Sequence, residues 1–338
     1  MSTSPSASRH GSETPWVHIV IVNYNAGAML QTCVDALAIQ TMPAFVVVII
    51  DNGSTNPAVT ELKLPDGRFQ IKPAGGNIGF AAGSNLGARH SICPWLAMLN
   101  PDTRPAADWL AELRAATERH PWARMFGSTQ LDAADPNIVD GFGDVLSSYG
   151  MAWRSLAGHP ASELPRNDRE VFSPCAAAAL YAKALFDEVG GFDESFFCYL
   201  EDVDLGFRLR LRGERCVQVR RAEVLHMASA VSGRMSEFSI FHSYRNRIWL
   251  LVKNIPWPLL GPVFLSWGAA TALSLTRPRA RPYRRAALRG TLAGLKGLPR
   301  AFGARARVQH ERVTGILETA RMLVWNPLRR KNRESFCE

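Results

Sequence analysis

The sequence predicts an α/β fold with a mostly parallel sheet and helices on both of its faces. Two short β-branched runs, residues 17–24 (VHIVIVNY) and 45–52 (FVVVIIDN), are apolar along nearly their whole length, and a stretch of helical character containing ALAIQ lies between them. A third run, residues 95–100 (WLAMLN), follows a glycine-rich connection and precedes an amphipathic helix pattern over residues 106–120. Apolar strands that alternate with helices are typical of parallel sheets covered on both sides, and such sheets bind ligands at the carboxyl ends of their strands.

The elements after residue 120 are less regular. Residues 130–172 are rich in loop-forming residues and hard to assign to elements. Residues 175–194 form an apolar stretch that ends in a Gly-Gly turn, and the acidic cluster after it opens a helix that Gly213 closes. Residues 218–226 (QVRRAEVLH) have the character of one more strand.

The composition is that of a globular protein with a full-sized core, since 47% of the 338 residues are hydrophobic and 20% are charged. Residues 1–15 are rich in serine with few apolar side chains, so we expect a disordered leader without the apolar run of a signal peptide. The six cysteines form no CxxC pair, which favours a reduced, cytoplasmic setting without structural zinc.

The formal net charge of +9 comes from basic residues near the end of the chain. From Arg277 onward there are 16 Lys and Arg residues against four acidic ones, a net charge of +12 that leaves −3 for the residues before it. Residues 254–276 carry no charge, but three prolines crowd their first half. We therefore expect three parts, a leader (1–15), an α/β domain (16–253) and an apolar, then basic, C-terminal region (254–338).

Asp102 follows the third strand at the point where its backbone must stop pairing. The residue before a proline is pushed away from helical geometry, and Pro101 cannot donate to a strand ladder, so the strand ends near Asn100. Asp102 then lies at the carboxyl edge of the sheet, where a ligand would bind. The alternative is that Asp102 only caps a turn before the next helix.

Asp51 ends the second strand in the same way, within IIDNGSTN. An ionised carboxylate only accepts hydrogen bonds, so it suits a ligand with an N–H group, such as the imide of a uracil or thymine ring. The alternative is an Asx turn that fixes the loop. Gly79, Gly83 and Gly87 recur at a spacing of four, which places them on one helix face for close approach to a strand or a ligand.

Glu201, Asp202 and Asp204 lie within one turn at the start of a predicted helix. The helix dipole favours acidic groups there, but like charges this close repel, so one of them is a candidate base. The dipole would lower its pKa and a neighbouring carboxylate would raise it, and both outcomes stay open. His226 ends the last predicted strand and is either a structural histidine or a ligand.

Six ordered motifs together resemble the family-2 glycosyltransferases, in particular their bacterial rhamnosyltransferase-like branch. The resemblance covers roughly residues 16–255, and it rests on VHIVIVNYNAG, VVIIDNGSTN, GGNIGFAAGSNLG, WLAMLNPDT, EVGGFDESFFCYLEDVDLGFRLRLRG and VLHMAS. It implies a GT-A fold, a Rossmann-like α/β domain that binds a nucleotide-sugar and Mg²⁺ or Mn²⁺ and transfers the sugar with inversion. The chain has no QxxRW motif, which argues against a processive synthase.

The resemblance also implies roles for individual residues. Asp202 matches the catalytic base, Asp102 the last acidic position of a DxD-like metal motif, and His226 a later metal ligand. The implied nucleotide-binding residues are Asn23, Asp51, Asn77, Gly79 and Asp102, and Glu201 and Asp204 form a supporting acidic cluster. The donor is then a dTDP-sugar or UDP-sugar, with rhamnose as the first guess, and the acceptor is a saccharide or a polyprenyl-diphosphate-linked saccharide in cell-surface polysaccharide assembly.

The C-terminal region suits an acceptor of that kind. Residues 254–276 are long enough to span a bilayer, but their prolines and tryptophans favour a segment at the interface. Leu288, Leu292 and Leu295 share one helical face and Arg289, Lys296 and Arg300 another. The pattern predicts a basic amphipathic helix on an anionic membrane surface, with about 1 kcal/mol per cation, at the cytoplasmic face of the plasma membrane. The alternative is a surface helix packed on the catalytic domain.

Two other functions remain open from the residues. One is a nucleotidyltransferase that makes the nucleotide-sugar and releases diphosphate. The other is a basic, non-catalytic protein whose tail contacts lipid or nucleic acid. The glycosyltransferase hypothesis, which we favour, involves no nucleic acid.

Overall fold

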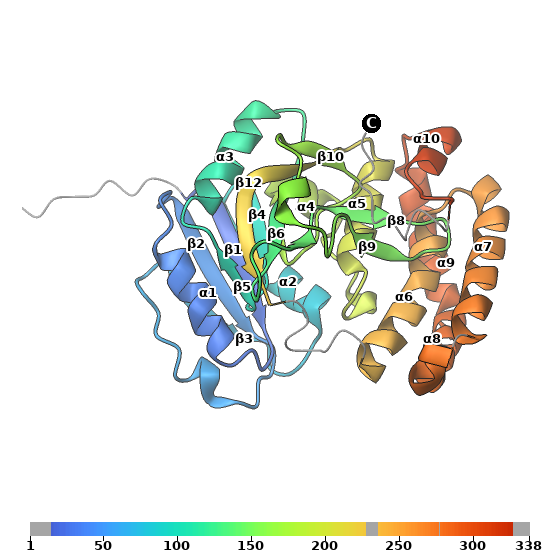
Figure 1. Ribbon diagram of the computed structural model, residues 1–338, viewed down its shortest axis with the longest axis horizontal. Helices are drawn as coiled ribbons and strands as arrows, with labels where there is room; N and C mark the ends of the chain where they lie inside the picture. The colour runs from blue at the N-terminus through green and yellow to red at the C-terminus, as the bar shows by residue number, and fades with distance from the viewer. Residues whose placement is uncertain (1–14, 228–235, 277, 327–338) are drawn as a thin grey trace, which may run out of the picture.

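The structure is a computed structural model that describes residues 15–227, 236–276 and 278–326. The predicted leader, residues 1–15, lies outside the described residues except for Pro15. Figure 1 shows a central twisted sheet with helices on both sides and a group of helices from the C-terminal third beside it. The predicted α/β class with a mostly parallel sheet is therefore confirmed.

The large sheet has the strand order β10-β12-β6-β11-β4-β1-β2-β3, with β5 paired to β12 and β7 to β6. The pairs β1–β2, β1–β4, β2–β3 and β6–β12 are parallel, whereas β11 runs antiparallel between β4 and β6. A separate hairpin pairs β8 with β9. The strands are β1 (Val17–Asn23), β2 (Phe45–Asp51), β3 (Phe69–Pro73), β4 (Trp95–Leu99), β5 (Thr103–Pro105), β6 (Met125–Asp132), β7 (Val139–Gly141), β8 (Asp144–Leu146), β9 (Ala152–Arg154), β10 (Arg169–Val171), β11 (Ala178–Ala182) and β12 (Cys216–His226).

Helices cover the sheet on both faces because successive side chains of its strands point to opposite sides. Ile19 and Ile21 of β1 pack in one core with α1 and α3, and Val20 and Val22 pack in the other with α2, α4 and α5. These helices are α1 (Ala28–Ala38), α2 (Phe80–Ala88), α3 (Trp109–Arg119), α4 (Lys183–Glu188) and α5 (Glu201–Leu211), with short 3₁₀ helices η1 (Pro57–Val59), η2 (Ala161–Glu163) and η3 (Glu194–Phe196).

The glycines at spacing four fulfil two different roles. Gly83 and Gly87 bring α2 against β1, since an added Cβ would lie 2.9 Å from Val22 and 2.4 Å from Val20. Gly79 instead precedes the helix with φ +88°, and a Cβ there would lie 2.6 Å from the carbonyl oxygen of Phe197. The first pair therefore serves packing, while Gly79 allows a loop far along the chain to approach.

Residues 130–172 contain more strand than the sequence suggested. Strands β7, β8, β9 and β10 each have three residues, and β7 and β10 extend the large sheet. Three residues are too few to establish a period, so the sequence pattern carries no signal for them.

The C-terminal region is helical and packs on the α/β part. It contains α6 (Glu237–Asn254), α7 (Trp257–Thr276), η4 (Pro278–Tyr283), α8 (Arg284–Lys296), α9 (Leu298–His310) and α10 (Ile316–Arg321). Helix α6 lies between α5 and the pair α8 and α9 (Figure 1). Helix α7 continues through its prolines. Pro258 lies in the first turn, where its missing N–H has no helical partner to lose, and Pro262 lies inside the helix and removes one backbone hydrogen bond. By length and composition alone α7 could cross a membrane, and most of it is not buried.

Candidate active site

A cavity of about 610 Å³ lies at the carboxyl ends of the strands, where the sequence predicted it. Its walls come from the ends of β1, β4 and β12, the loops before α2 and β11, and the segment that leads into α5. The lining residues are Val22, Tyr24, Asn52, Asn77, Gly79, Phe80, Asn100, Pro101, Asp102, Arg154, Cys175, Ala176, Ala177, Phe197, Cys198, Tyr199, Leu200, Glu201, Asp202, His226 and Phe238.

Asp102 faces this cavity from a tight turn after β4. Strand β4 ends at Leu99, and the turn closes when the backbone N–H of Thr103 donates to the carbonyl of Asn100 over 3.2 Å. Asp102 is buried, and its Oδ1 has no hydrogen-bond partner among the described residues. The hydroxyl of Thr103 also donates to the carbonyl of Asn100, over 2.7 Å. The turn is therefore closed through Thr103 rather than capped by Oδ1 of Asp102, which was the alternative role.

His226 meets Asp102 because β12 pairs with β5, which places the last residue of β12 opposite Thr103. The Nε2 atom of His226 lies 3.5 Å from Oδ1 of Asp102, and its Nδ1 lies 2.7 Å from Oδ2 of Asp140. Asp140 only accepts, so Nδ1 carries a ring proton, and Nε2 is the ring atom that faces Asp102. Burial alone would lower the pKa of His226, but the neighbouring carboxylates of Asp102 and Asp140 outweigh burial and raise that pKa.

Arg154 and Asp140 are site residues that sequence reasoning missed. Arg154, at the end of β9, lines the cavity, forms an ion pair with Asp140 and donates to Oε1 of Gln130 over 2.9 Å. Both residues lie in the short strands of residues 130–172, which had no periodic signal. Together they fix the ring of His226 from behind.

The pair Asp102 and His226 fits a divalent cation. Two atoms that each lie about 2.1 Å from one ion are separated by about 3–3.5 Å, depending on the angle at the ion, and the separation of Oδ1 and Nε2 is 3.5 Å. The missing hydrogen-bond partner of Asp102 Oδ1 is a second sign that this atom serves a ligand. Among the described residues no cluster of three or more His, Cys, Asp or Glu side chains is suited to hold a metal. Other ligands of an ion here would be oxygens of a bound substrate or water.

Asp202 and Glu201 line the cavity at the start of α5. Asp202 accepts hydrogen bonds from the backbone N–H of Ala176 over 3.0 Å and of Val203 over 2.8 Å. Burial outweighs these bonds and raises the pKa of Asp202. Burial and the charge of Asp202 raise the pKa of Glu201 well above its usual value. Desolvation, which the sequence argument did not weigh, is thus the main cause of the raised pKa of Asp202, rather than the helix dipole or a neighbouring carboxylate.

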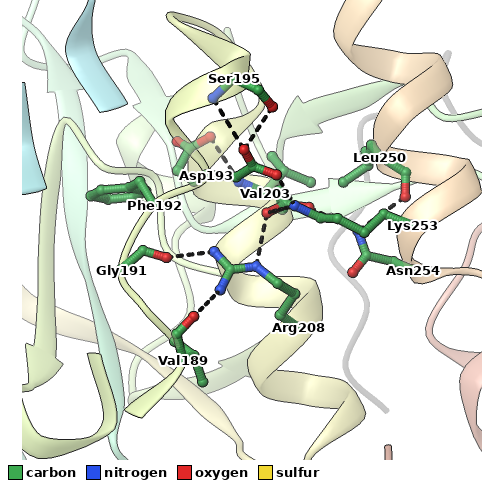
Figure 2. A network of polar contacts seen from close by, with 12 residues as sticks. Val189, Gly191, Phe192, Asp193, Ser195, Val203, Arg208, Leu250, Lys253 and Asn254 are labelled. Carbon is green, nitrogen blue, oxygen red and sulfur yellow. Dashed lines mark hydrogen bonds and ion pairs between the residues drawn. The ribbon is translucent and has the colours of Figure 1, made fainter. Parts of the chain in front are cut away.

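Asp204 does not belong to the cavity, contrary to its grouping with Glu201 and Asp202. It is fully buried and accepts from Arg208 Nε over 2.9 Å, Lys253 Nζ over 2.8 Å and Asn254 Nδ2 over 2.9 Å. Figure 2 shows this network, in which Lys253 also donates to Asp193 over 2.6 Å. The network joins α5 to α6, so the role of Asp204 is structural.

The residues expected to bind a nucleotide fall into two layers. Asn77 and Gly79 line the cavity, together with Asn52, which the sequence analysis had not singled out and which donates to Oδ1 of Asn77 over 3.1 Å. Asn23 and Asp51 lie side by side on β1 and β2 but do not line the cavity. Both contact Ser54, since Asn23 donates to its hydroxyl over 2.9 Å and Asp51 Oδ1 accepts from its backbone N–H over 3.2 Å.

Comparisons with known proteins show which proteins this chain is similar to. Residues 18–133 match the model of glycosyl transferase family 2. The chain is 28% identical over 295 residues to the N-acetylglucosaminyl-diphospho-decaprenol L-rhamnosyltransferase of Mycobacterium tuberculosis, covering 78% of this chain and 95% of that protein. It is 29% identical over 262 residues to the O-antigen biosynthesis protein RfbC of Myxococcus xanthus, covering 72% of this chain and 20% of that protein.

Solved structures show the same fold. The structure of GalNAc-T7 with UDP, GalNAc and Mn²⁺ has a TM-score of 0.62 at 14% identity and covers 85% of this chain, which spans 56% of that one. The mannosyltransferase PcManGT from Pyrobaculum calidifontis, in complex with GDP-Man and Mn²⁺, has a TM-score of 0.52 at 17% identity and covers 91% of this chain and 86% of its own. The predicted GT-A fold is therefore confirmed.

Proposed function

Because the chain carries a family 2 glycosyltransferase domain on a GT-A fold, we propose that it is an inverting, metal-dependent, non-processive transferase of cell-surface polysaccharide assembly. The donor is a dTDP-sugar or UDP-sugar, with rhamnose as the sugar. The acceptor is a saccharide linked to a polyprenyl diphosphate, by analogy with the mycobacterial relative. The observation that carries the proposal is one cavity that holds both a carboxylate–imidazole pair and a separate basic carboxylate.

Asp102 and His226 would hold the cation in this mechanism. When bound, Mg²⁺ or Mn²⁺ acts as a Lewis acid toward the departing diphosphate. Arg154 and Asp140 keep the ring of His226 in place, and the bond from Nδ1 to Asp140 turns Nε2 toward Asp102 as the ring atom that would bind the cation. An imidazole ligand favours Mn²⁺ over the harder Mg²⁺, which prefers oxygen ligands.

Asp202 would act as the general base. Its raised pKa strengthens it as a proton acceptor, while the two backbone N–H bonds fix its orientation. It takes the proton from the acceptor hydroxyl as the hydroxyl oxygen forms a bond to the anomeric carbon and the sugar–phosphate bond breaks. The electron pair of that bond leaves with the nucleoside diphosphate. A single displacement of this kind inverts the anomeric configuration.

The nucleotide would bind between the loops after β1 and β2 and the loop before α2. Asn77 and Gly79 line this part of the cavity, and Asn23 supports it from behind through Ser54. We assign Asp51 to the ring N–H of a pyrimidine base. Because Ser54 bonds to Oδ1, its Oδ2 is the atom that would accept this N–H.

The C-terminal helices would attach the enzyme to the cytoplasmic face of the plasma membrane. Helix α8 buries Gly290 and Gly294 against α6 and turns its leucines outward, with exposed fractions of 50%, 58% and 43% for Leu288, Leu292 and Leu295. The cations Arg285, Arg289, Lys296 and Arg300 on and beside α8 are exposed as well. The leucine face is thus not the face packed on the catalytic domain, which favours the membrane over an ordinary surface helix.

Membrane attachment is tested by co-sedimentation with vesicles that contain 30% phosphatidylglycerol. We expect serine at Leu288, Leu292 and Leu295 together to weaken binding at least about tenfold, since each buried leucine contributes about 1.5–3 kcal/mol. Ile92, which is 85% exposed on another part of the molecule, gives the control variant Ile92→Ser. Equal binding of both variants would contradict this part of the proposal.

The function is tested by thermal unfolding with nucleoside diphosphates and nucleotide-sugars, each with and without Mn²⁺. We expect a pyrimidine diphosphate to raise the unfolding temperature only with the metal, and Asp102→Ala to abolish the increase. Absence of any metal-dependent increase would refute the proposal and favour a non-catalytic binding protein. Release of a nucleoside diphosphate supports transfer, whereas release of diphosphate would identify a nucleotidyltransferase.

A further inference from the structure

The segment that leads into Asp202 has a strained backbone. Five described non-glycine residues have φ in the left-handed region, and three of them lie within residues 197–200, namely Phe197 at 64°, Tyr199 at 71° and Leu200 at 66°. Side chains with a Cβ rarely adopt this region, and such residues persist only where the surrounding structure holds them. A specific contact is therefore needed to keep this segment as it is.

The first of these residues forms a γ-turn with positive φ. The backbone N–H of Cys198 donates to the carbonyl of Phe196 over 2.7 Å, and the residue between them, Phe197, has φ 64° and ψ −63°. This type of γ-turn is rare and strained. It reverses the chain between η3 and α5, so that residues 197–200 all line the cavity.

Asn246 of α6 holds this segment from one side. Its Nδ2 donates to the carbonyl oxygens of Phe196, Cys198 and Tyr199 over 2.9, 2.9 and 2.7 Å. The side chain of Asn246 is fully buried, and its Oδ1 accepts from Nε of Arg245 over 2.8 Å. A single amide group thus forms hydrogen bonds with three carbonyls. A chain without backbone strain would not direct all three carbonyls to one point.

Helix α2 holds the segment from the other side. The carbonyl of Phe197 accepts from the backbone N–H of Ala81 over 3.2 Å, in the first turn of α2. Gly79 makes this approach possible because it has no Cβ. The segment is therefore fixed between α2 and α6, and Leu200 at its end is the N-cap residue of α5. The backbone at Leu200 decides where Asp202, two residues later, enters the cavity.

We propose that Asn246 is the positioning residue that fixes the backbone of residues 197–200 and thereby places Asp202 in the cavity. The proposal rests on the proposed role of Asp202 as general base. A misplacement of about 1 Å at a reacting group can reduce the rate about 100-fold. Loss of the Asn246 amide is therefore expected to lower kcat more than it changes the KM of the donor, because Asn77 and Asp102 are held by other residues.

The test compares Asn246→Ala with Gln309→Ala. Gln309 of α9 is a matched control, because its amide also donates to main-chain carbonyls, those of Lys253 and Asn254, about two turns along α6 from Asn246. We expect Asn246→Ala to lower kcat about 10- to 100-fold with donor KM changed less than threefold, and Gln309→Ala to change neither more than twofold. Adding Leu200→Gly to Asn246→Ala is expected to restore kcat at least threefold, because glycine adopts the left-handed conformation without strain.

A second measurement does not depend on activity. Hydrogen exchange of the amides of residues 198–200 is expected to be at least tenfold faster in Asn246→Ala than in the wild type or Gln309→Ala. Unchanged exchange, a kcat equal to that of Gln309→Ala, or no recovery with Leu200→Gly would each overturn the proposal. If the wild type transfers no sugar, the proposed function fails, and the exchange rates alone then decide whether Asn246 fixes the segment.

Discussion

Lys253 is expected to contribute strongly to the stability of this fold. Its Nζ lies 2.6 Å from Asp193 and 2.8 Å from Asp204, and its side chain is only 3% exposed (Figure 2). The change Lys253→Met keeps the length of the side chain and removes the charge. Asp204, which is fully buried, then loses one of its two cations.

The size of the effect follows from these contacts. Removing one partner of a buried ion pair costs about 3–5 kcal/mol because the other charge stays buried. Asp204 keeps Arg208 and Asn254, so we expect the lower end, about 3 kcal/mol. With about 2.1 cal/mol/K of unfolding entropy per residue, this corresponds to about 4 °C in the unfolding temperature.

The assay is thermal and urea unfolding followed by tryptophan fluorescence, with Arg114→Met as the control. Arg114 forms an exposed helical pair with Glu118 at 3.9 Å, and its loss is expected to cost about 0.5 kcal/mol or less. A loss below about 1 kcal/mol for Lys253→Met, or one equal to that of Arg114→Met, would refute the reasoning.

The same variant has an expected pH dependence. Burial alone would raise the pKa of Asp193, but Lys253 and the bonds from Ser195 outweigh it and lower that pKa. A lowered folded-state pKa stabilises the protein above the pKa of an unfolded aspartate, about 3.9, and this stabilisation is lost as the pH falls through the folded-state value. The loss of unfolding free energy in Lys253→Met is therefore expected to be complete at pH 7 and to become smaller below about pH 4.

Four further outcomes are expected at the site. Asp202→Asn removes the base but not the side-chain volume, so initial rates should fall by about 10²–10⁴ while the metal-dependent thermal shift with nucleotide persists. Since burial raises the pKa of Asp202, kcat of the wild type should fall in acid at a pH above the usual aspartate value of about 3.9, and a pH–rate profile checks this. Asp140→Asn weakens the hold on Nδ1 of His226, and a Mn²⁺ titration of the nucleotide-bound protein should show about 10- to 100-fold weaker metal binding. Gly79→Ala places a Cβ 2.6 Å from the Phe197 carbonyl at φ +88°, so thermal unfolding should show a loss of about 1–3 kcal/mol.

The residues that could be predicted from the sequence are those at the ends of regular elements. Asp102 follows β4 and His226 ends β12, so a pattern that locates a strand also locates its terminal side chain. Parallel strands bring these ends to one edge of the sheet, but the contact between residues 124 positions apart also requires the pairing of β12 with the short strand β5. The apolar runs therefore predict the edge that Asp102 and His226 share, and not the short distance between them.

Residues held by irregular or distant contacts could not be predicted. Arg154 and Asp140 come from strands of three residues, and Asn246 acts through carbonyls of a segment about 50 positions earlier. The predicted grouping of Asp204 with Asp202 differs from the structure for another reason. Residues two positions apart on a helix are rotated by about 200°, so Asp202 and Asp204 point to different sides of α5. Because the two residues are close in sequence, they were expected to share one site. In the structure Asp202 lies in the cavity, whereas Asp204 joins α5 to α6.

Helix α6 connects the two parts that composition separates. The net charge and apolar content change near residue 254, yet Arg305 of α9 donates to the carbonyls of Val252 and Ile255 over 2.6 Å and so caps the end of α6. The same helix presents Asn246 to the segment before Asp202 and Lys253 to Asp204. In the proposed mechanism the face that meets the membrane and the base that accepts the proton are thus supported by one helix. Packing thus joins the C-terminal helices to α6, across the boundary near residue 254 that the composition suggests.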